Sequence, residues 1–385
     1  MGVDVPVSTA TAPLPHPGLL RAAPPPALGT HDMARVLAVG TAVPPTGYTQ
    51  RELLDILDVR DPRIRSVYLN SAIERRFLTL PEAGPDGTRV METTGQLLAK
   101  HKQQGVAMGV RAVHECLKQT GADLSDVRYL CCVTSTGFLT PGFSALLIRE
   151  LGLDRHVSRA DVVGMGCNAG LNSLNVVAGW ARSNPGELAV MVCIEACSAA
   201  YVFDGTMRTS VVNSLFGDGS AAVALVAGGR DDDTVPHRTT PRIVDFTSCI
   251  IPEAVDAMRY DWDTAQNGFS FYLDPDIPYV VGAHARATVD RLLGRSGLRQ
   301  DDVAHWLVHS GGKKVIDAVG VNLGLTRYDL RHTISVLRDY GNLSSGSFLF
   351  SYERLLREAT VRPGEYGVFM TMGPGSTIET ALVRW

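Results

Sequence analysis

Apolar residues along this chain recur in two alternating patterns, short continuous runs and longer stretches with helical spacing. The runs Val36–Val39 and Ala304–His309 are typical of buried strands. A helix over residues 168–182 is predicted by four apolar residues on one face, Leu171, Leu174, Ala178 and Ala181. This alternation predicts an α/β protein whose sheets are sandwiched between helices.

The pattern also repeats. The segment GADLSDVRYLCCVTSTG, from Gly121, resembles GLRQDDVAHWLVHSG, from Gly297. Helix-like stretches precede them, at residues 111–120 and 287–296, and each segment leads into a small-residue turn and another helical pattern. Farther along the chain, FGDGS at 216–220 is similar to MGPGS at 372–376. Two copies of one α/β unit are predicted, over residues 33–235 and 236–385, with the join near residues 229–237. Chance similarity of short apolar strings is the alternative.

Composition and charge narrow the class of protein. Residues 1–32 are rich in Pro and Ala, which predicts a disordered or extended leader. The formal net charge of −4 gives no electrostatic basis for binding nucleic acid or an anionic membrane. No apolar run approaches the roughly 20 residues that cross a bilayer. Seven cysteines without a secretion signal predict reduced thiols in the cytoplasm, and none has the spacing of a metal site.

Cys167, in the turn GMGCNAG, is the strongest candidate nucleophile. The turn joins a predicted strand end at residues 161–165 to the predicted helix, so the thiol would lie at a helix N-terminus. There the free N–H groups and the helix dipole are expected to lower the pKa of the thiol. The alternative for any cysteine is a buried structural role, which we expect for Cys116, Cys131, Cys132 and Cys249.

Two further polar residues lie in similar turns. His309 ends a predicted strand in LVHSGG, and Asn342 lies in DYGNLSSGS. Each residue alone also fits a structural role, the histidine in the core and the asparagine in a turn or helix cap. Together, a thiol, an imidazole and a carboxamide suit acyl transfer from a thioester. The sulfur attacks, and the other two groups donate hydrogen bonds to the developing oxyanion.

Four segments in this order, GMGCNAG, LVHSGGKKVID, YGNLSSGS and MGPGSTIET, resemble the type III polyketide synthases, the chalcone- and stilbene-synthase-like enzymes. The resemblance implies a thiolase fold, a duplicated αβαβα core in a homodimer. It also implies coenzyme A thioesters as substrates, with malonyl-CoA as extender and no further cofactor. Cys167 would carry the acyl chain, while His309 and Asn342 would stabilise the enolate formed when malonyl-CoA loses CO2.

The same resemblance suggests residues of the substrate pocket. Phe216 and Phe271 match aromatic residues between tunnel and cavity, and Gly373 and Gly375 match a loop that shapes the cavity floor. Cys197 and Ala200 match pocket-lining positions, and Thr140 matches the residue that enters the partner's cavity. Arg63 matches one cation that contacts coenzyme A, but Ser66 and Asn70 occupy the other two positions. Nearby Arg65, Arg75 or Arg76 could substitute for them, but we expect these three to be solvated surface charges.

Within the family, the chain is most similar to a bacterial branch that makes 3,5-dihydroxyphenylacetyl-CoA in glycopeptide-antibiotic pathways. That implies four malonyl-CoA units, cyclisation on the enzyme and companion enzymes of the enoyl-CoA hydratase type. Alternatives are another starter and product, a ketoacyl-ACP synthase III-like enzyme, and an HMG-CoA-synthase-like enzyme with Glu195 as base. A Cys-His hydrolase and a non-catalytic partner subunit are also considered; retention of Cys167 argues against the latter.

Overall fold

The computed structural model describes residues 33–85, 89, 92–200, 205–228, 240–264 and 268–385. The Pro/Ala-rich leader and the predicted join near 229–237 lie outside these residues. The helices are α1 (Gln50–Ile56), α2 (Pro62–Leu69), α3 (Thr94–Leu117), α4 (Phe143–Leu151), α5 (Ala169–Ser183), α6 (Met207–Asn213), α7 (Ile277–Gly294), α8 (Lys313–Leu323), α9 (Arg331–Tyr340) and α10 (Ser347–Glu358). The strands are β1 (Arg35–Ala42), β2 (Gly47–Thr49), β3 (Arg75–Phe77), β4 (Val127–Thr134), β5 (Ser158–Val163), β6 (Leu188–Glu195), β7 (Gly219–Val226), β8 (Arg242–Ile250), β9 (Met258–Asp263), β10 (Gly268–Leu273), β11 (Val303–Val308), β12 (Tyr366–Gly373) and β13 (Thr377–Arg384).

Nine strands join in the order β11-β12-β13-β8-β1-β7-β6-β4-β5. The two sequence halves meet at β1 and β8, which pair antiparallel through Arg35 and Arg242. On either side of this junction the order is the same: β7, β6 and β4 correspond to β13, β12 and β11. β5 has no counterpart in the second half of this order. The predicted duplication is therefore present in the topology.

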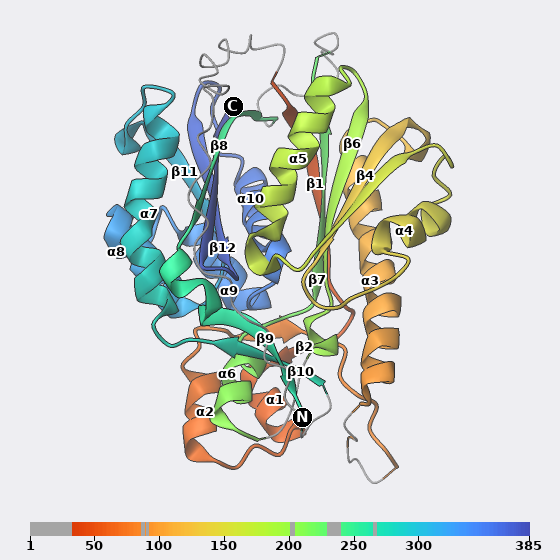
Figure 1. Ribbon diagram of the computed structural model, residues 1–385, viewed down its shortest axis with the longest axis vertical. Helices are drawn as coiled ribbons and strands as arrows, with labels where there is room; N and C mark the ends of the chain where they lie inside the picture. Colours follow the sequence, from red (N-terminus) through yellow and green to blue (C-terminus); the bar gives the residue numbers. More distant parts are fainter. Residues whose placement is uncertain (1–32, 86–88, 90–91, 201–204, 229–239, 265–267) are drawn as a thin grey trace, which may run out of the picture.

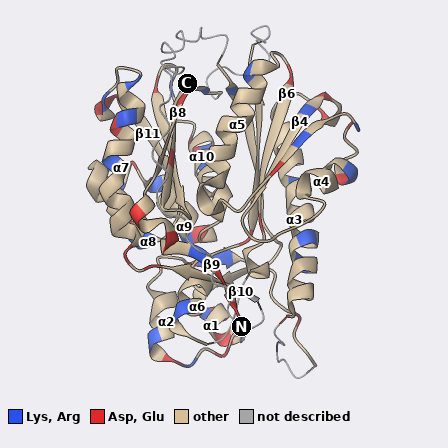
Figure 2. Cartoon of the chain, viewed as in Figure 1, with Lys and Arg blue, Asp and Glu red and all other residues tan. Residues whose placement is uncertain are grey.

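The sheet and helices form layers (Figure 1). Helices α5 and α10 lie between the two halves of the sheet, α7 and α8 cover one outer face, and α3 and α4 cover the other. Each interlayer space is filled by its own cluster of buried apolar residues. In Figure 2 charged residues lie mainly on outer helices and connecting loops, while α5 carries a single one, Arg182. This arrangement gives the αβαβα layers that the resemblance implied.

The sequence pattern located several elements well. The helix predicted over 168–182 is α5, and the helix-like stretches at 111–120 and 287–296 are the C-terminal parts of the longer helices α3 and α7. At one end of the layers lies a smaller cap, made of α1, α2, α6 and the β9–β10 hairpin (Figure 1). The cap and the ends of the sheet strands enclose the site described next.

Candidate active site

Cys167 lies in a short 3₁₀ turn, Gly166–Asn168, that leads directly into α5. The turn needs small neighbours, because a Cβ on Gly166 would lie 2.3 Å from Pro374 and one on Gly373 would lie 3.0 Å from the Cys167 nitrogen. The hairpin loop between β12 and β13 therefore packs tightly against the turn that carries Cys167. This close packing leaves no room for a side chain at Gly373. Gly375 has a φ of +77°, a left-handed conformation that favours glycine.

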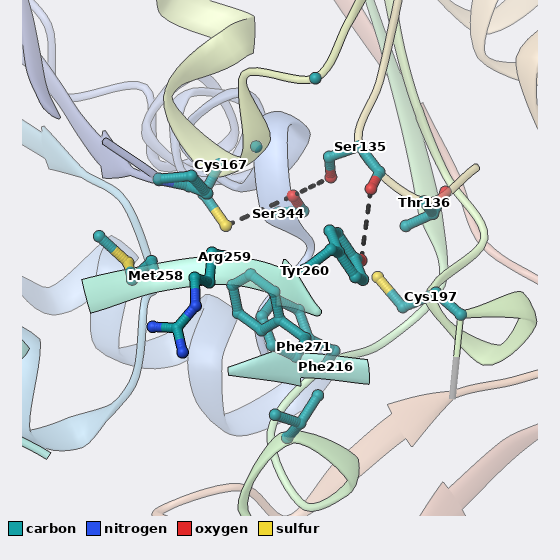
Figure 3. Close-up of a pocket in the computed structure, with 15 residues that line it drawn as sticks. Ser135, Thr136, Cys167, Cys197, Phe216, Met258, Arg259, Tyr260, Phe271 and Ser344 are labelled. Atoms are coloured by element: carbon teal, nitrogen blue, oxygen red, sulfur yellow. Dashed lines mark hydrogen bonds between the residues drawn. The ribbon is translucent and has the colours of Figure 1, made fainter. Parts of the chain in front are cut away.

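The Cys167 side chain is 8% exposed and lines a cavity of about 350 Å³ (Figure 3). Four of the predicted pocket residues line the same cavity: Cys197, Ala200, Phe216 and Phe271. The rings of Phe216 and Phe271 meet edge to face, with 6.0 Å between their centroids. Pro374, between the two predicted loop glycines, also lines it. The walls are mainly apolar, which suits a cavity that excludes water from a reactive thioester.

The second and third polar residues approach Cys167 through one short segment. The Ser344 hydroxyl donates to Cys167 Sγ at 3.4 Å, and the Asn342 side chain also hydrogen-bonds to this sulfur. Asn342 Oδ1 accepts the Ser344 backbone N–H at 2.8 Å, which leaves its Nδ2 as a donor. His309 is 2% exposed, and its Nδ1 hydrogen-bonds to the hydroxyl of Ser347, three residues after Ser344. Segment Ser344–Ser347 thus contacts both Cys167 and His309.

The thiol and the imidazole are both neutral in this enclosed site. Burial raises the pKa of Cys167 to about 12, more than the hydrogen bonds from Ser344 and Asn342 lower it. Burial also lowers the pKa of His309 to about 3. The expectation that the helix N-terminus lowers the pKa of the thiol is therefore wrong, because desolvation outweighs the dipole. Attack on a thioester requires a group that accepts the thiol proton.

A chain of hydroxyl groups leads from Cys167 through Ser344 to Ser135 (Figure 3), and from there to the buried carboxyl group of Glu195. Ser344 Oγ lies 2.6 Å from Ser135 Oγ, and the Ser135 hydroxyl donates to Glu195 Oε2 at 3.0 Å. Glu195 is fully buried, and burial raises its pKa to about 7 although Ser135 and Ser345 donate to it. Sequence reasoning considered Glu195 but missed Ser135 and Ser344. The hydroxyl-rich strings TST and LSSGS were the available signal.

Tyr260 is a further residue that the sequence did not indicate. It lies on β9, beside Met258 and Arg259 in the cavity wall, and its hydroxyl donates to the Ser135 carbonyl at 3.4 Å. Its ring lies 5.1 Å from that of Phe271, centroid to centroid. The β9–β10 hairpin therefore contributes an aromatic wall opposite Cys167 (Figure 3).

Several predicted residues lie outside the cavity or have other roles. Thr140 and Arg63 are exposed and do not line it, and Ser66 and Asn70 bond to each other on the surface. Arg76, expected at the surface, is fully buried and donates to the carbonyls of Asn213 and Phe216. Cys116, Cys131 and Cys132 are buried as expected, but Cys249 is partly exposed because β8 carries it next to an exposed strand end.

Fold and cavity together indicate a thiolase-like acyltransferase with Cys167 in the cavity wall. Residues 27–229 match the N-terminal domain of the chalcone and stilbene synthases, and residues 243–385 match the C-terminal domain. The chain belongs to this family, the type III polyketide synthases, which act on coenzyme A thioesters without a further cofactor.

Relatives and solved structures agree with this assignment. The chain is 66% identical to 3,5-dihydroxyphenylacetyl-CoA synthase of Streptomyces toyocaensis and 65% identical to that of Amycolatopsis balhimycina, in both cases over 100% of each chain. It superposes on PKS-I of the brown alga Ectocarpus siliculosus with a TM-score of 0.83 and 27% identity, covering 91% of this chain and 98% of that one. For 1,3,6,8-tetrahydroxynaphthalene synthase of Streptomyces coelicolor the TM-score is 0.81, the identity 26% and the coverage 91% and 99%.

None of the described helices has both the length and the apolar character needed to cross a bilayer.

Proposed function

We propose that the protein makes 3,5-dihydroxyphenylacetyl-CoA from four molecules of malonyl-CoA, one of which is decarboxylated as starter. The observation that carries this product is the full-length identity of 65–66% to two relatives named for it. The lower identity of 31% to the tetrahydroxynaphthalene synthase of Streptomyces peucetius favours it over the product of that relative.

Cys167 is the proposed acyl carrier. Its sulfur attacks the thioester carbonyl, the C–S bond to coenzyme A breaks, and the acyl group stays on Cys167. Each extender malonyl-CoA then loses CO2, and the resulting enolate carbon attacks the acyl group and releases Cys167. The new chain, one two-carbon unit longer, can be transferred back to the same sulfur. The support is the position of the thiol in the cavity wall, within reach of two hydrogen-bond donors.

Asn342 and His309 are the proposed donors to the thioester oxygen. Decarboxylation places negative charge on that oxygen, and preorganised donors in a water-poor cavity stabilise it most effectively. Asn342 Nδ2 is available because Oδ1 is bound to the Ser344 N–H. His309 donates through Nε2 whenever that nitrogen carries a proton, since Nδ1 is bound to Ser347.

Other proposed site residues follow from their placement. Phe216, Phe271, Cys197 and Ala200 shape the volume available to the growing chain, together with the loop at Gly373 and Gly375. Glu195, linked to the cavity through Ser135 and Ser344, is the proposed proton acceptor for cyclisation. Arg63 is proposed to contact coenzyme A at the surface of the cap, where it is exposed.

The active form is proposed to be a homodimer. Among the described strands β5 pairs only with β4, so one side of this edge strand is open. Apolar side chains are exposed on β5 and on elements packed near it, with Val163 44%, Val176 51% and Phe138 76% exposed. Thr140 lies on the same exposed loop as Phe138, which is consistent with its reaching a partner's cavity.

The seven free thiols fit a cytoplasmic location. Companion enzymes of the enoyl-CoA hydratase type are proposed to aid aromatisation.

Incubation of the purified protein with malonyl-CoA alone tests the proposed product. We expect an eight-carbon aromatic or pre-aromatic CoA thioester, identified by mass, and more of the aromatic form when a hydratase-type companion is added. Turnover that requires a second acyl-CoA would contradict the malonyl starter. A product of another chain length would contradict the product and leave the family assignment intact.

A further inference from the structure

Tyr260 brings a phenol hydroxyl into the cavity wall from the β9–β10 hairpin (Figure 3). The residue as a whole is 44% exposed, but its hydroxyl is directed inward and donates to the Ser135 carbonyl at 3.4 Å. This distance exceeds the roughly 2.5–3.0 Å of a good O–H···O hydrogen bond, so the proton is held weakly. A stronger acceptor that enters the cavity can therefore take over this hydrogen bond.

The other hydroxyl groups of the cavity wall are engaged more firmly. Those of Ser344 and Ser135 bond to each other at 2.6 Å and lead to the sulfur and to the buried carboxyl group. That of Thr136 accepts from the Ala196 N–H at 3.0 Å and lies 3.3 Å from a second hydroxyl and from a histidine nitrogen. Among the described residues that line the cavity, Tyr260 thus has the hydroxyl proton most easily turned toward a substrate.

The surroundings of this hydroxyl keep it protonated. Burial, and then the electrostatic influence of Cys197, Glu195 and Cys167, raises the pKa of Tyr260 well above its ordinary value. The phenol therefore acts as a neutral hydrogen-bond donor and does not give up its proton. Because Cys167 and Glu195 both influence it, the hydroxyl lies within electrostatic reach of the proposed acyl carrier and of the proposed proton acceptor.

Ring closure needs a donor that chain extension does not need. In the proposed reaction Asn342 and His309 serve the thioester oxygen, whereas ring closure places negative charge on a ketone oxygen farther along the chain. A preorganised donor for that second oxygen has to lie in another part of the cavity wall. Tyr260 meets this requirement, because the hairpin holds it across the cavity from the turn that carries Cys167 (Figure 3).

We propose that Tyr260 is a catalytic residue of ring closure, whose hydroxyl donates a hydrogen bond to the ketone oxygen attacked by the chain. The proposal rests on the proposed function. A C–H bond of the chain breaks and its proton passes by way of Ser135 to Glu195. The carbanion forms a C–C bond to the ketone carbon, and the π electron pair moves to the oxygen that Tyr260 holds. The proton then returns from Glu195 to this oxygen, so that both residues regain their starting form.

Tyr260→Phe tests this role, because it removes the hydroxyl and keeps the ring that packs 5.1 Å from Phe271, centroid to centroid. The matched control is Tyr272→Phe on the same hairpin, whose hydroxyl bonds to Asp274 at 3.1 Å and which does not line the cavity. Each variant is incubated with ¹³C-labelled malonyl-CoA. Release of CO2 reports extension, and mass spectrometry after chromatography separates ring-closed product from the lactone that an unclosed chain forms.

In Tyr260→Phe we expect the ratio of ring-closed product to lactone to fall about 10²-fold, the usual effect of losing one oxyanion donor. Release of CO2 should fall less than about threefold, and Tyr272→Phe should match the wild type in both measurements. An unchanged product ratio in Tyr260→Phe, or equal falls in ring closure and CO2 release, would overturn the proposal. A wild type that closes a chain of another length would contradict the proposed product instead, and the same ratio in Tyr260→Phe would still decide the role of the hydroxyl.

Discussion

At the scale of single residues, burial decides the protonation of the site: it raises the pKa of the Cys167 thiol to about 12 and that of the Glu195 carboxyl group to about 7. Cys167 and Asn342 were predicted from separate turns, and their side chains are in contact. The protonation states were predicted wrongly for the thiol, because a motif shows the helix N-terminus but not the depth of burial. Ser135 and Ser344 were missed since a serine in a small-residue string is ordinarily turn chemistry.

Cys167→Ala should abolish formation of the condensed product, because no sulfur remains to hold the acyl chain, while some decarboxylation of malonyl-CoA persists. Product mass and release of CO2 measure the two activities separately. Cys249→Ala, at a partly exposed thiol outside the cavity wall, is the control and should retain full activity. Full product from Cys167→Ala would show that the nucleophile is another residue.

Asn342→Ala should slow decarboxylation by about 10²–10³, the usual effect of losing one oxyanion donor. Loading of Cys167 should fall less, because the attacking sulfur itself remains in place. Decarboxylation is followed by release of CO2 and loading by the mass of the protein. Equal losses in both steps would argue against stabilisation of the enolate by this carboxamide.

Glu195 gives a pH dependence of stability. Its pKa is about 7 in the folded protein against an ordinary 4.5, so between these values the folded state binds more protons than the unfolded state. Stability therefore falls as pH rises from about 4.5 to about 7 and then levels. At about 1.4 kcal/mol per tenfold change in proton affinity, the loss is on the order of 3 kcal/mol.

Glu195→Gln removes this titration. The unfolding free energy of the variant relative to the wild type should rise from about pH 4.5 to about pH 7 and then level, measured by urea denaturation at each pH. Glu150→Gln, at an exposed position, serves as control and should follow the wild type throughout. A constant difference between Glu195→Gln and the wild type would show that the carboxyl group titrates at its ordinary pKa.

At the scale of elements, periodicity located α5 to within a residue at each end, and the internal repeat indicated the corresponding halves of the sheet. The sequence did not predict the cap, because short elements such as β3 and α6 contain too few residues to show a period of apolar positions. Arg76 shows the reason. Arg76 was expected in solvent because it is charged. Instead, its guanidinium donates to the Gln50 side chain on α1 and to the carbonyls of Asn213 and Phe216, and so it connects β3 to the rest of the cap.

Arg76→Met should therefore destabilise the protein by about 3 kcal/mol or more, because it leaves several buried acceptors without a donor. The neighbouring Arg75→Met is the matched control, since Arg75 is exposed and its removal should cost little. Urea denaturation measures both. Because Arg76 donates to the Phe216 carbonyl and Phe216 lines the cavity, Arg76→Met should also raise KM for malonyl-CoA. An unchanged unfolding free energy in Arg76→Met would show that the buried acceptors bind other donors.

At the scale of the whole molecule, the large sheet has two edge strands, β11 and β5, and each pairs on one side only among the described strands. One end, β11, is followed by helices of the second half, and the other, β5, has no counterpart across the pseudo-symmetry. An edge strand with exposed apolar neighbours is a template for pairing with another strand. Two copies of β5 meeting antiparallel would continue the sheet through both protomers and satisfy this edge with a twofold interface.

Val163→Glu should therefore shift the protein toward monomer, because it places a charge at the end of this edge. Val321→Glu is the control, since Val321 is an equally apolar and more exposed residue, 82% against 44%, on the outer helix α8. Light scattering during size-exclusion chromatography measures the mass, and circular dichroism confirms that both variants are folded. We expect at least a tenfold weaker self-association for Val163→Glu alone. Loss of activity along with the dimer would further support the proposed reach of Thr140 into the partner's cavity, whereas an unchanged dimer in Val163→Glu would place the interface on another face.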